Sequence, residues 1–194
     1  MTTQHYYGCG MEEFMYLEKI QSPEDVKKLD VEQLKVLAGE MRQALIQKLS
    51  VHGGHVGPNL GMVEATIAMH YVFDSPKDKM VFDVSHQSYC HKMLTGRADA
   101  FLDEAKYDDV SGYSEPSESA HDFFCIGHTS TSVSLACGLA KARDLADENY
   151  NVIAVIGDGS LSGGEALEGL DFAKELNGNL IVVVNDNEMS IAEN

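Results

Sequence analysis

Two short polar motifs in the last third of the chain each follow an apolar run that reads as a buried strand. Gly157-Asp158-Gly159 ends the first run, and Asn185-Asp186-Asn187 ends the second. Ligands of an open parallel sheet bind at the carboxyl ends of its strands, so Asp158 and Asn187 are expected to meet at one edge. Carboxylate and amide oxygens suit a hard divalent ion such as Mg²⁺, which completes its shell with phosphates and water. The simplest interpretation is a magnesium-bridged diphosphate.

Gly-rich segments close to this edge could hold the phosphates. Gly159 and Ser160 lead into Gly163-Gly164, which would leave backbone N–H groups free at a helix N-terminus. In Gly127-His128-Thr129-Ser130, the glycine permits close backbone approach, and a Thr or Ser hydroxyl is expected to cap the following helix while the amides face the ligand. The alternative is that these are ordinary turns, with Asp158 as a capping residue and Asn187 in a left-handed loop conformation.

Histidines are the candidate acid–base groups, because the pKa of imidazole lies near working pH. Four of the eight, at positions 55, 86, 91 and 128, lie in predicted loops or helix starts near the proposed edge. A structural role remains open for each of them. A zinc site is disfavoured because no Cys or carboxylate lies at a matching interval. We assign no role to His91, nor to the histidines at 52, 70 and 121.

The elements that must position these residues alternate between helix and strand, which predicts an α/β fold with an open, mostly parallel sheet and helices on both faces. Residues 1–29 are expected to form an N-terminal arm and residues 30–194 one domain, with a capping box of Asp30 and Gln33 at its start. We expect helices at 30–49, 62–73, 87–94, 130–146 and 165–176, strands at 80–84, 123–126, 152–157 and 180–185, a Gly-rich loop at 52–58 and a polar, acidic, flexible connection at 98–122.

The composition is that of a soluble globular chain of 194 residues with a net charge of −17. This charge disfavours binding to nucleic acid or to anionic membrane surfaces. The four cysteines form no CxxC pair, which favours scattered thiols in a reducing compartment over a disulfide scaffold. No apolar run reaches the ~18 residues of a membrane span, and the N-terminus lacks a signal-peptide pattern. We expect a cytoplasmic protein.

Several segments together resemble a known family. GDG followed by NDN is similar to the thiamine diphosphate signature. DVSHQSYCHKMLTGR (83–97), GHTSTSVSLACGLAKARD (127–144) and NDNEMSIAEN (185–194) resemble 1-deoxy-D-xylulose-5-phosphate synthases, which are transketolase-like enzymes. The resemblance extends over about residues 34–194. It implies the thiamine-diphosphate-binding, transketolase-like fold.

The resemblance also implies residue roles. Asp158, Asn187 and the main-chain carbonyl of Met189 would hold Mg²⁺. His55, His86 and His128 would line the active site, contact the diphosphate or transfer protons. Cofactor contacts would come from the residues His86, Gly127, His128, Thr129, Gly159, Ser160, Asn187 and Met189.

Two motifs depart from the family pattern. The family usually has GHS where this chain has Gly127-His128-Thr129, a change that keeps the hydroxyl and adds a methyl group. The synthases commonly carry HFASGLG where this chain has HVGPNLG at residues 55–61. Pro58 and Asn59 therefore replace small residues, which puts the shape of this loop in question.

The implied reaction is a magnesium- and thiamine-diphosphate-dependent condensation of pyruvate with glyceraldehyde 3-phosphate, with loss of CO₂, in the synthesis of precursors of isoprenoids, thiamine and pyridoxal. In the family the glutamate that activates the cofactor lies in a second domain, so we expect an incomplete enzyme that lacks the pyrimidine and C-terminal domains. It would need a homodimeric partner or a complementary C-terminal subunit. Two alternatives remain open: the N-terminal subunit of a split transketolase, and a non-catalytic module that binds metal and diphosphate.

Overall fold

The structure, a computed structural model, describes residues 14–176, 178–186, 189–190 and 192–193. The strands are β1 (Lys79–Phe82), β2 (Val152–Gly157), β3 (Leu180–Asn185), β4 (Met189–Ser190) and β5 (Ala192–Glu193). The helical elements are η1 (Leu17–Lys19), α1 (Pro23–Val26), α2 (Val31–His52), α3 (Val56–Leu60), α4 (Val63–Val72), α5 (Tyr89–Lys92), η2 (Met93–Arg97), α6 (Asp99–Leu102), η3 (Glu104–Asp109), α7 (Ser132–Leu145), α8 (Asp158–Leu161) and α9 (Gly164–Glu175).

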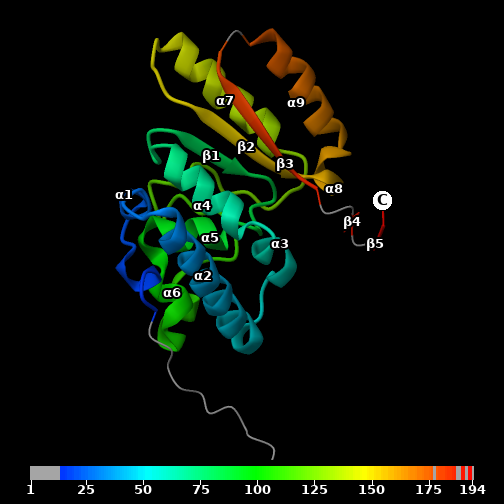
Figure 1. Cartoon of the computed structure of the whole chain (residues 1–194). Helices are drawn as coiled ribbons and strands as arrows, with labels where there is room; N and C mark the ends of the chain where they lie inside the picture. The colour runs from blue at the N-terminus through cyan, green and yellow to red at the C-terminus, as the bar shows by residue number, and fades with distance from the viewer. Residues whose placement is uncertain (1–13, 177, 187–188, 191, 194) are drawn as a thin grey trace, which may run out of the picture.

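The centre of the fold is a three-stranded parallel sheet in the order β1-β2-β3. Apolar side chains of β2 alternate between its faces. Val152, Ala154 and Ile156 pack with α7 and α9, while Ile153 and Val155 pack with the residues of α4. Figure 1 shows α7 and α9 on one side of this sheet and α4 on the other. The predicted α/β architecture with an open parallel sheet and helices on both faces is confirmed.

Local signals define the longest helix. Asp30 and Gln33 form the predicted capping box: the Asp30 side chain accepts from Gln33 N at 2.9 Å, and Gln33 Oε1 accepts from Asp30 N at 2.8 Å. The helix ends at Gly53, whose φ of 83° lies in the left-handed region that favours glycine. The end of α2 therefore turns the chain toward the His55 loop.

The described part of the predicted N-terminal arm, residues 14–29, packs against the core. Leu17, Ile20 and Val26 are buried in one cluster with α2 residues such as Leu37 and Leu45. The division into an arm and a domain at residue 30 stays a prediction. None of the described helices is long and apolar enough to cross a membrane.

Two predicted elements are wrong. Residues 123–126 are irregular and do not form a strand. Their backbone and side chains make contacts with distant residues instead: the Ile126 carbonyl oxygen accepts a hydrogen bond from Ser85 Oγ at 2.9 Å, and Lys79 Nζ lies 4.5 Å from the centre of the Phe123 ring. The Gly-rich loop at 52–58 runs into helix α3. Pro58 is tolerated there because it lies in the first turn, where the missing N–H would have no helical acceptor.

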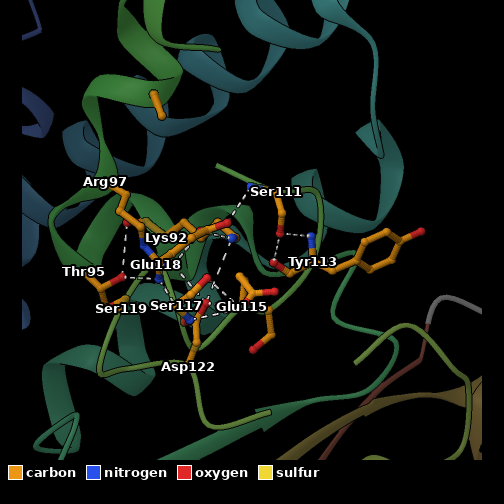
Figure 2. Close-up of polar contacts among 12 residues, drawn as sticks. Lys92, Thr95, Arg97, Ser111, Tyr113, Glu115, Ser117, Glu118, Ser119 and Asp122 are labelled. Carbon is orange, nitrogen blue, oxygen red and sulfur yellow. Dashed lines mark hydrogen bonds and ion pairs between the residues drawn. The ribbon is translucent and has the colours of Figure 1, made fainter. Parts of the chain in front are cut away.

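The sequence predicts a polar, acidic, flexible connection at 98–122, but this segment contains α6 and η3 and contributes to a buried group of ion pairs, the Asp122 network (Figure 2). Arg97 donates to both Asp122 oxygens at 2.9 Å and to Glu118 Oε2 at 3.0 Å. The side chain of Lys92 has no exposed surface, and its Nζ also contacts Glu118. Buried charges must be paired, so this network holds the acidic connection against α5 and η2.

Histidines extend the Asp122 network into the core. His91 Nε2 lies 3.1 Å from Asp122 Oδ1, and His91 Nδ1 lies 2.9 Å from His70 Nε2. Both histidines are buried, with at most 2% of each residue exposed. Burial lowers the pKa values of His70 and His91, although the hydrogen bond to Asp122 opposes this for His91. Burial of Asp122 opposes ionisation, but its hydrogen bonds from His91 and Arg97 outweigh this and keep its pKa below the usual value.

We expect the free energy of unfolding to decrease as the pH is lowered from 7.5 to 5. The pKa values of His70 and His91 are lowered from 6.5 by folding, so unfolding takes up protons in this range. Their stabilisation is complete above pH 6.5 and is lost as the pH falls toward the folded pKa values, at roughly 1.4 kcal/mol per group and pH unit. Urea denaturation at several pH values measures this loss.

His70→Gln should flatten this profile because it removes one buried titrating group. His52→Gln is the matched control, since its side chain is 38% exposed and pairs with Asp108 at the surface. A profile equally steep in the His70→Gln variant and in the unaltered protein would contradict the assignment.

Candidate functional site

The carboxyl ends of the three parallel strands border a cavity of about 400 Å³, the strand-end cavity. Its wall comes from the ends of β2 and β3, from the segments that follow β1 and β2, from α3 and from the residue that caps α4. The lining residues are Pro58, Met62, Asp83, His86, Gln87, Gly157, Asp158, Gly159, Ser160 and Asn185. This is the place where open parallel sheets bind their ligands. Four of the sequence-predicted site residues, His86, Asp158, Gly159 and Ser160, are brought together here.

The charge of the strand-end cavity is one-sided. Two of its described lining residues, Asp83 and Asp158, are acidic, and none is Lys or Arg. An anionic group would therefore be repelled unless it arrived with a cation. Oxygen ligands of this kind suit a hard divalent ion. Among the described residues, no group of three or more His, Cys, Asp or Glu side chains could hold a metal ion, so a metal here would need amide, main-chain, water or phosphate oxygens as well.

His86 lines the strand-end cavity and carries a buried polar atom without a partner among the described residues. Its Nδ1 is buried and has no hydrogen-bond partner among the described residues, and the same holds for Oε1 of the adjacent Gln87. Burial lowers the pKa of His86, and the neighbouring His55 adds to this, while Asp83 and Gln87 act in the opposite direction. His86 is therefore neutral at pH 7, and a buried atom without a partner favours a ligand that supplies one.

The imidazole of His55 lies next to that of His86. The two imidazole centroids are 5.3 Å apart in an edge-to-face arrangement, and His55 Nδ1 lies 3.2 Å from the Tyr89 hydroxyl. The Tyr113 ring lies against His55 at 5.6 Å. Figure 2 shows how Tyr113 extends from the edge of the Asp122 network, where Ser111 is bound to Glu118. His55 also lines a second, smaller cavity of about 270 Å³.

Asn59 fixes the positions of both histidine segments. Its Nδ2 donates to the carbonyl oxygens of His55 at 2.7 Å and His86 at 2.8 Å, and its Oδ1 accepts from Tyr89 N at 2.9 Å. The residue has no exposed surface. Asn59 is one of the two residues that replace small residues of the family pattern in this loop. Its side chain therefore forms hydrogen bonds on both sides of the loop.

Asp83, which the sequence reasoning missed, holds the start of α7 against the end of β1. Its Oδ1 accepts from Ser130 N and its Oδ2 from Ser132 N, both at 2.9 Å. The side chain of the N-cap residue Thr131 makes no capping bond. The expected cap from a hydroxyl at Thr129 or Ser130 is therefore wrong, because the Asp83 carboxylate, directly after β1, accepts hydrogen bonds from the first amides of the helix.

The backbone after Asp83 is strained. Val84 and Ser85 have φ angles of 56° and 67°, in the left-handed region that β-branched and other non-glycine residues rarely occupy. Ser85 Oγ bonds to Ile126 O and accepts from Ser114 N at 2.8 Å. Such conformations persist only where the surroundings fix them, and they cluster at functional sites.

The Gly127-His128-Thr129 segment differs from the expectation. All three residues are exposed and none of them lines the strand-end cavity. His128 Nδ1 lies 2.8 Å from the Thr129 carbonyl oxygen. The next residue, Ser130, is bonded to two residues that line the cavity, and the ligand contacts predicted for the segment stay predictions.

The metal ligands predicted after β3 are only partly covered. Asn187 lies outside the described residues. Met189 begins the short strand β4, whose backbone pairs with that of Glu193 in β5. Asp158 is the first residue of α8, directly after the end of β2. The predicted helix N-terminus at Gly163-Gly164 is the start of α9, and the short helix α8 precedes it.

Comparison with known proteins gives one consistent result. A family model described as 1-deoxy-D-xylulose-5-phosphate synthase matches residues 17–194. The chain is similar to the proteins of that name from Dictyoglomus turgidum (54% identity over 180 residues, covering 93% of this chain and 29% of the relative) and Pelotomaculum thermopropionicum (55% over 178 residues, covering 92% and 28%). A relative from Brevibacillus brevis is 55% identical over 180 residues. The chain thus spans less than a third of the length of these relatives.

We expect Asn59→Ala to destabilise the protein by about 3 kcal/mol, because it leaves two buried carbonyl oxygens and one buried N–H without their partner. Asn179→Ala is the matched control: the Asn179 side chain donates to Asn151 Oδ1, and that bond is exposed. Urea denaturation of the two variants gives the comparison. Equal losses of stability would show that Asn59 does not hold the two histidine segments.

Proposed function

Because the chain belongs to the 1-deoxy-D-xylulose-5-phosphate synthase family, we propose that it is the part of such an enzyme that binds the diphosphate end of thiamine diphosphate together with Mg²⁺. The observation that carries this proposal is the strand-end cavity, which has oxygen ligands and no Lys or Arg among its described lining. A diphosphate fits such a wall only with a divalent cation bound between them.

The proposed metal ligands are the Asp158 carboxylate, the Asn187 side chain and the main-chain carbonyl of Met189. Asp158 lines the strand-end cavity, and Met189 lies in β4, which contacts α8. Main-chain amides of Gly159 and Ser160 would donate to phosphate oxygens. The buried Nδ1 of His86 has no partner among the described residues, so a ligand atom could satisfy it. The residues present therefore fit the group.

We propose that His55, His86 and His128 serve the reacting end of the cofactor. His86 lines the strand-end cavity and adjoins His55, and the lowered pKa of His86 keeps it neutral and able to accept a proton near pH 7. His128, with Gly127 and Thr129, lies on the exposed segment beside Ser130. A ligand that extends beyond the strand-end cavity would contact these residues.

The proposed reaction of the whole enzyme is the condensation of pyruvate with glyceraldehyde 3-phosphate with loss of CO₂. The bound cofactor would supply the carbanion chemistry, and the chain would supply binding, orientation and proton transfer. Since the relatives are more than three times as long as the matched stretch, we propose that the reaction also uses residues from a further portion or a partner chain, with a homodimer as the expected assembly.

Calorimetric titration of thiamine diphosphate into the protein should show binding that requires Mg²⁺. Asp158→Asn should weaken this binding at least tenfold, because it removes the one carboxylate proposed for the metal. Asp171→Asn makes the same chemical change on the exposed part of α9 and should leave the affinity unchanged.

Two outcomes would contradict the proposal: binding that is equally tight with and without Mg²⁺, and equal affinities of the Asp158→Asn and Asp171→Asn variants. Circular dichroism of each variant shows whether it is folded, so that a loss of binding can be attributed to the site.

A further inference from the structure

Polar contacts beside the strand-end cavity converge on Ser130, the residue between the exposed 127–129 segment and α7. Its Oγ donates to the Ser160 carbonyl oxygen at 2.6 Å, and its N–H donates to Asp83 Oδ1 at 2.9 Å. Ser160 and Asp83 both line the cavity, and Ser130 itself is 7% exposed. One buried serine therefore connects the wall that follows β1 to the wall that follows β2.

The contact between Ser130 and the segment after β2 is close. A Cβ atom added to Gly163 would lie 1.9 Å from Ser130 Oγ and 2.6 Å from Ser130 Cβ. Gly163 N donates to the same Ser160 carbonyl oxygen at 3.1 Å. Both hydrogen bonds thus end on one acceptor, and only glycine at position 163 leaves space for the serine.

Ser130 adopts a left-handed backbone conformation, with a φ of 70°, which is uncommon for residues other than glycine. Its N–H and Oγ bonds hold it in this conformation, and the same bonds align it with Asp83 and Ser160. A strained residue whose N–H and hydroxyl are both engaged indicates a fixed junction at this point.

We propose that Ser130 is a positioning residue that fixes Asp158, Gly159 and Ser160 in the conformation that binds a metal-bound diphosphate. Helix α8 has only four residues, and a helix this short is not stable without tertiary contacts. The bond from Ser130 Oγ to Ser160 O supplies such a contact. A segment ordered before the ligand arrives does not lose that freedom on binding, so the affinity is higher.

This inference rests on the proposed function and is tested with the same ligand. Thiamine diphosphate with Mg²⁺ is titrated into the unaltered protein and into Ser130→Ala, Ser130→Gly and Ser134→Ala variants. Ser134 is the matched control, because its Oγ also donates from α7 to a main-chain oxygen, that of Glu165 at 3.3 Å, and Ser134 does not line the cavity. Ser130→Gly suits the left-handed backbone and covers the case in which alanine there prevents folding.

Loss of one preorganising hydrogen bond should weaken binding about three- to tenfold in both Ser130 variants and less than twofold in Ser134→Ala. Equal affinities in the unaltered protein and the Ser130 variants would overturn the inference and leave the proposed function intact. An equal loss in Ser134→Ala would also overturn it, because the effect would then belong to general packing of α7.

Hydrogen exchange of the unliganded protein provides a readout that does not depend on binding. The amides of residues 159–163 should exchange several-fold faster in Ser130→Ala than in Ser134→Ala. If the unaltered protein does not bind the cofactor, the proposed function fails, and the exchange rates alone decide the inference. Equal rates in the two variants would overturn it.

Discussion

The bonds of the Asp83 carboxylate to the start of α7 are the interaction on which the rest of the site depends. This carboxylate is 1% exposed, so it needs donors, and the amides of Ser130 and Ser132 supply them. The bonds hold a helix to the end of β1. They also fix the chain on both sides: the strained turn at Val84 and Ser85 leads to His86, and Ser130 reaches the segment after β2.

Much of the fold follows from patterns that are local in the sequence. The periodicity of α2, its capping box and its end at Gly53 were predictable, as was the parallel pairing of β2 with β3 around α9. The errors occur where distant side chains decide the backbone. Residues 123–126 have a strand-like composition, but Ile126 is hydrogen-bonded to Ser85 and Phe123 contacts Lys79. The acidic connection is ordered by its ion pairs with Arg97 and Lys92.

Sequence reasoning anticipated which residues lie together at the strand ends where a polar residue follows a strand directly. Asp158 was predicted because it ends an apolar run, and it lines the strand-end cavity with His86. Asp83 also follows a strand and could have been found by the same signal. Asn59 could not, since its partners His86 and Tyr89 lie 27 and 30 positions away along the chain. The exposure of Gly127 and His128 could not be predicted from the sequence either, because it depends on packing and not on sequence pattern.

The one-sided charge of the strand-end cavity bears on what competes for it in a cell. Inorganic phosphate and uncomplexed nucleotides are abundant anions, and a phosphate pocket built from lysine or arginine attracts all of them. The described wall of this cavity offers carboxylate and amide oxygens and has no such residue. Under the proposed function, such a wall would disfavour free phosphates relative to those that carry their own metal, and the selectivity would come from the absence of a fixed positive charge.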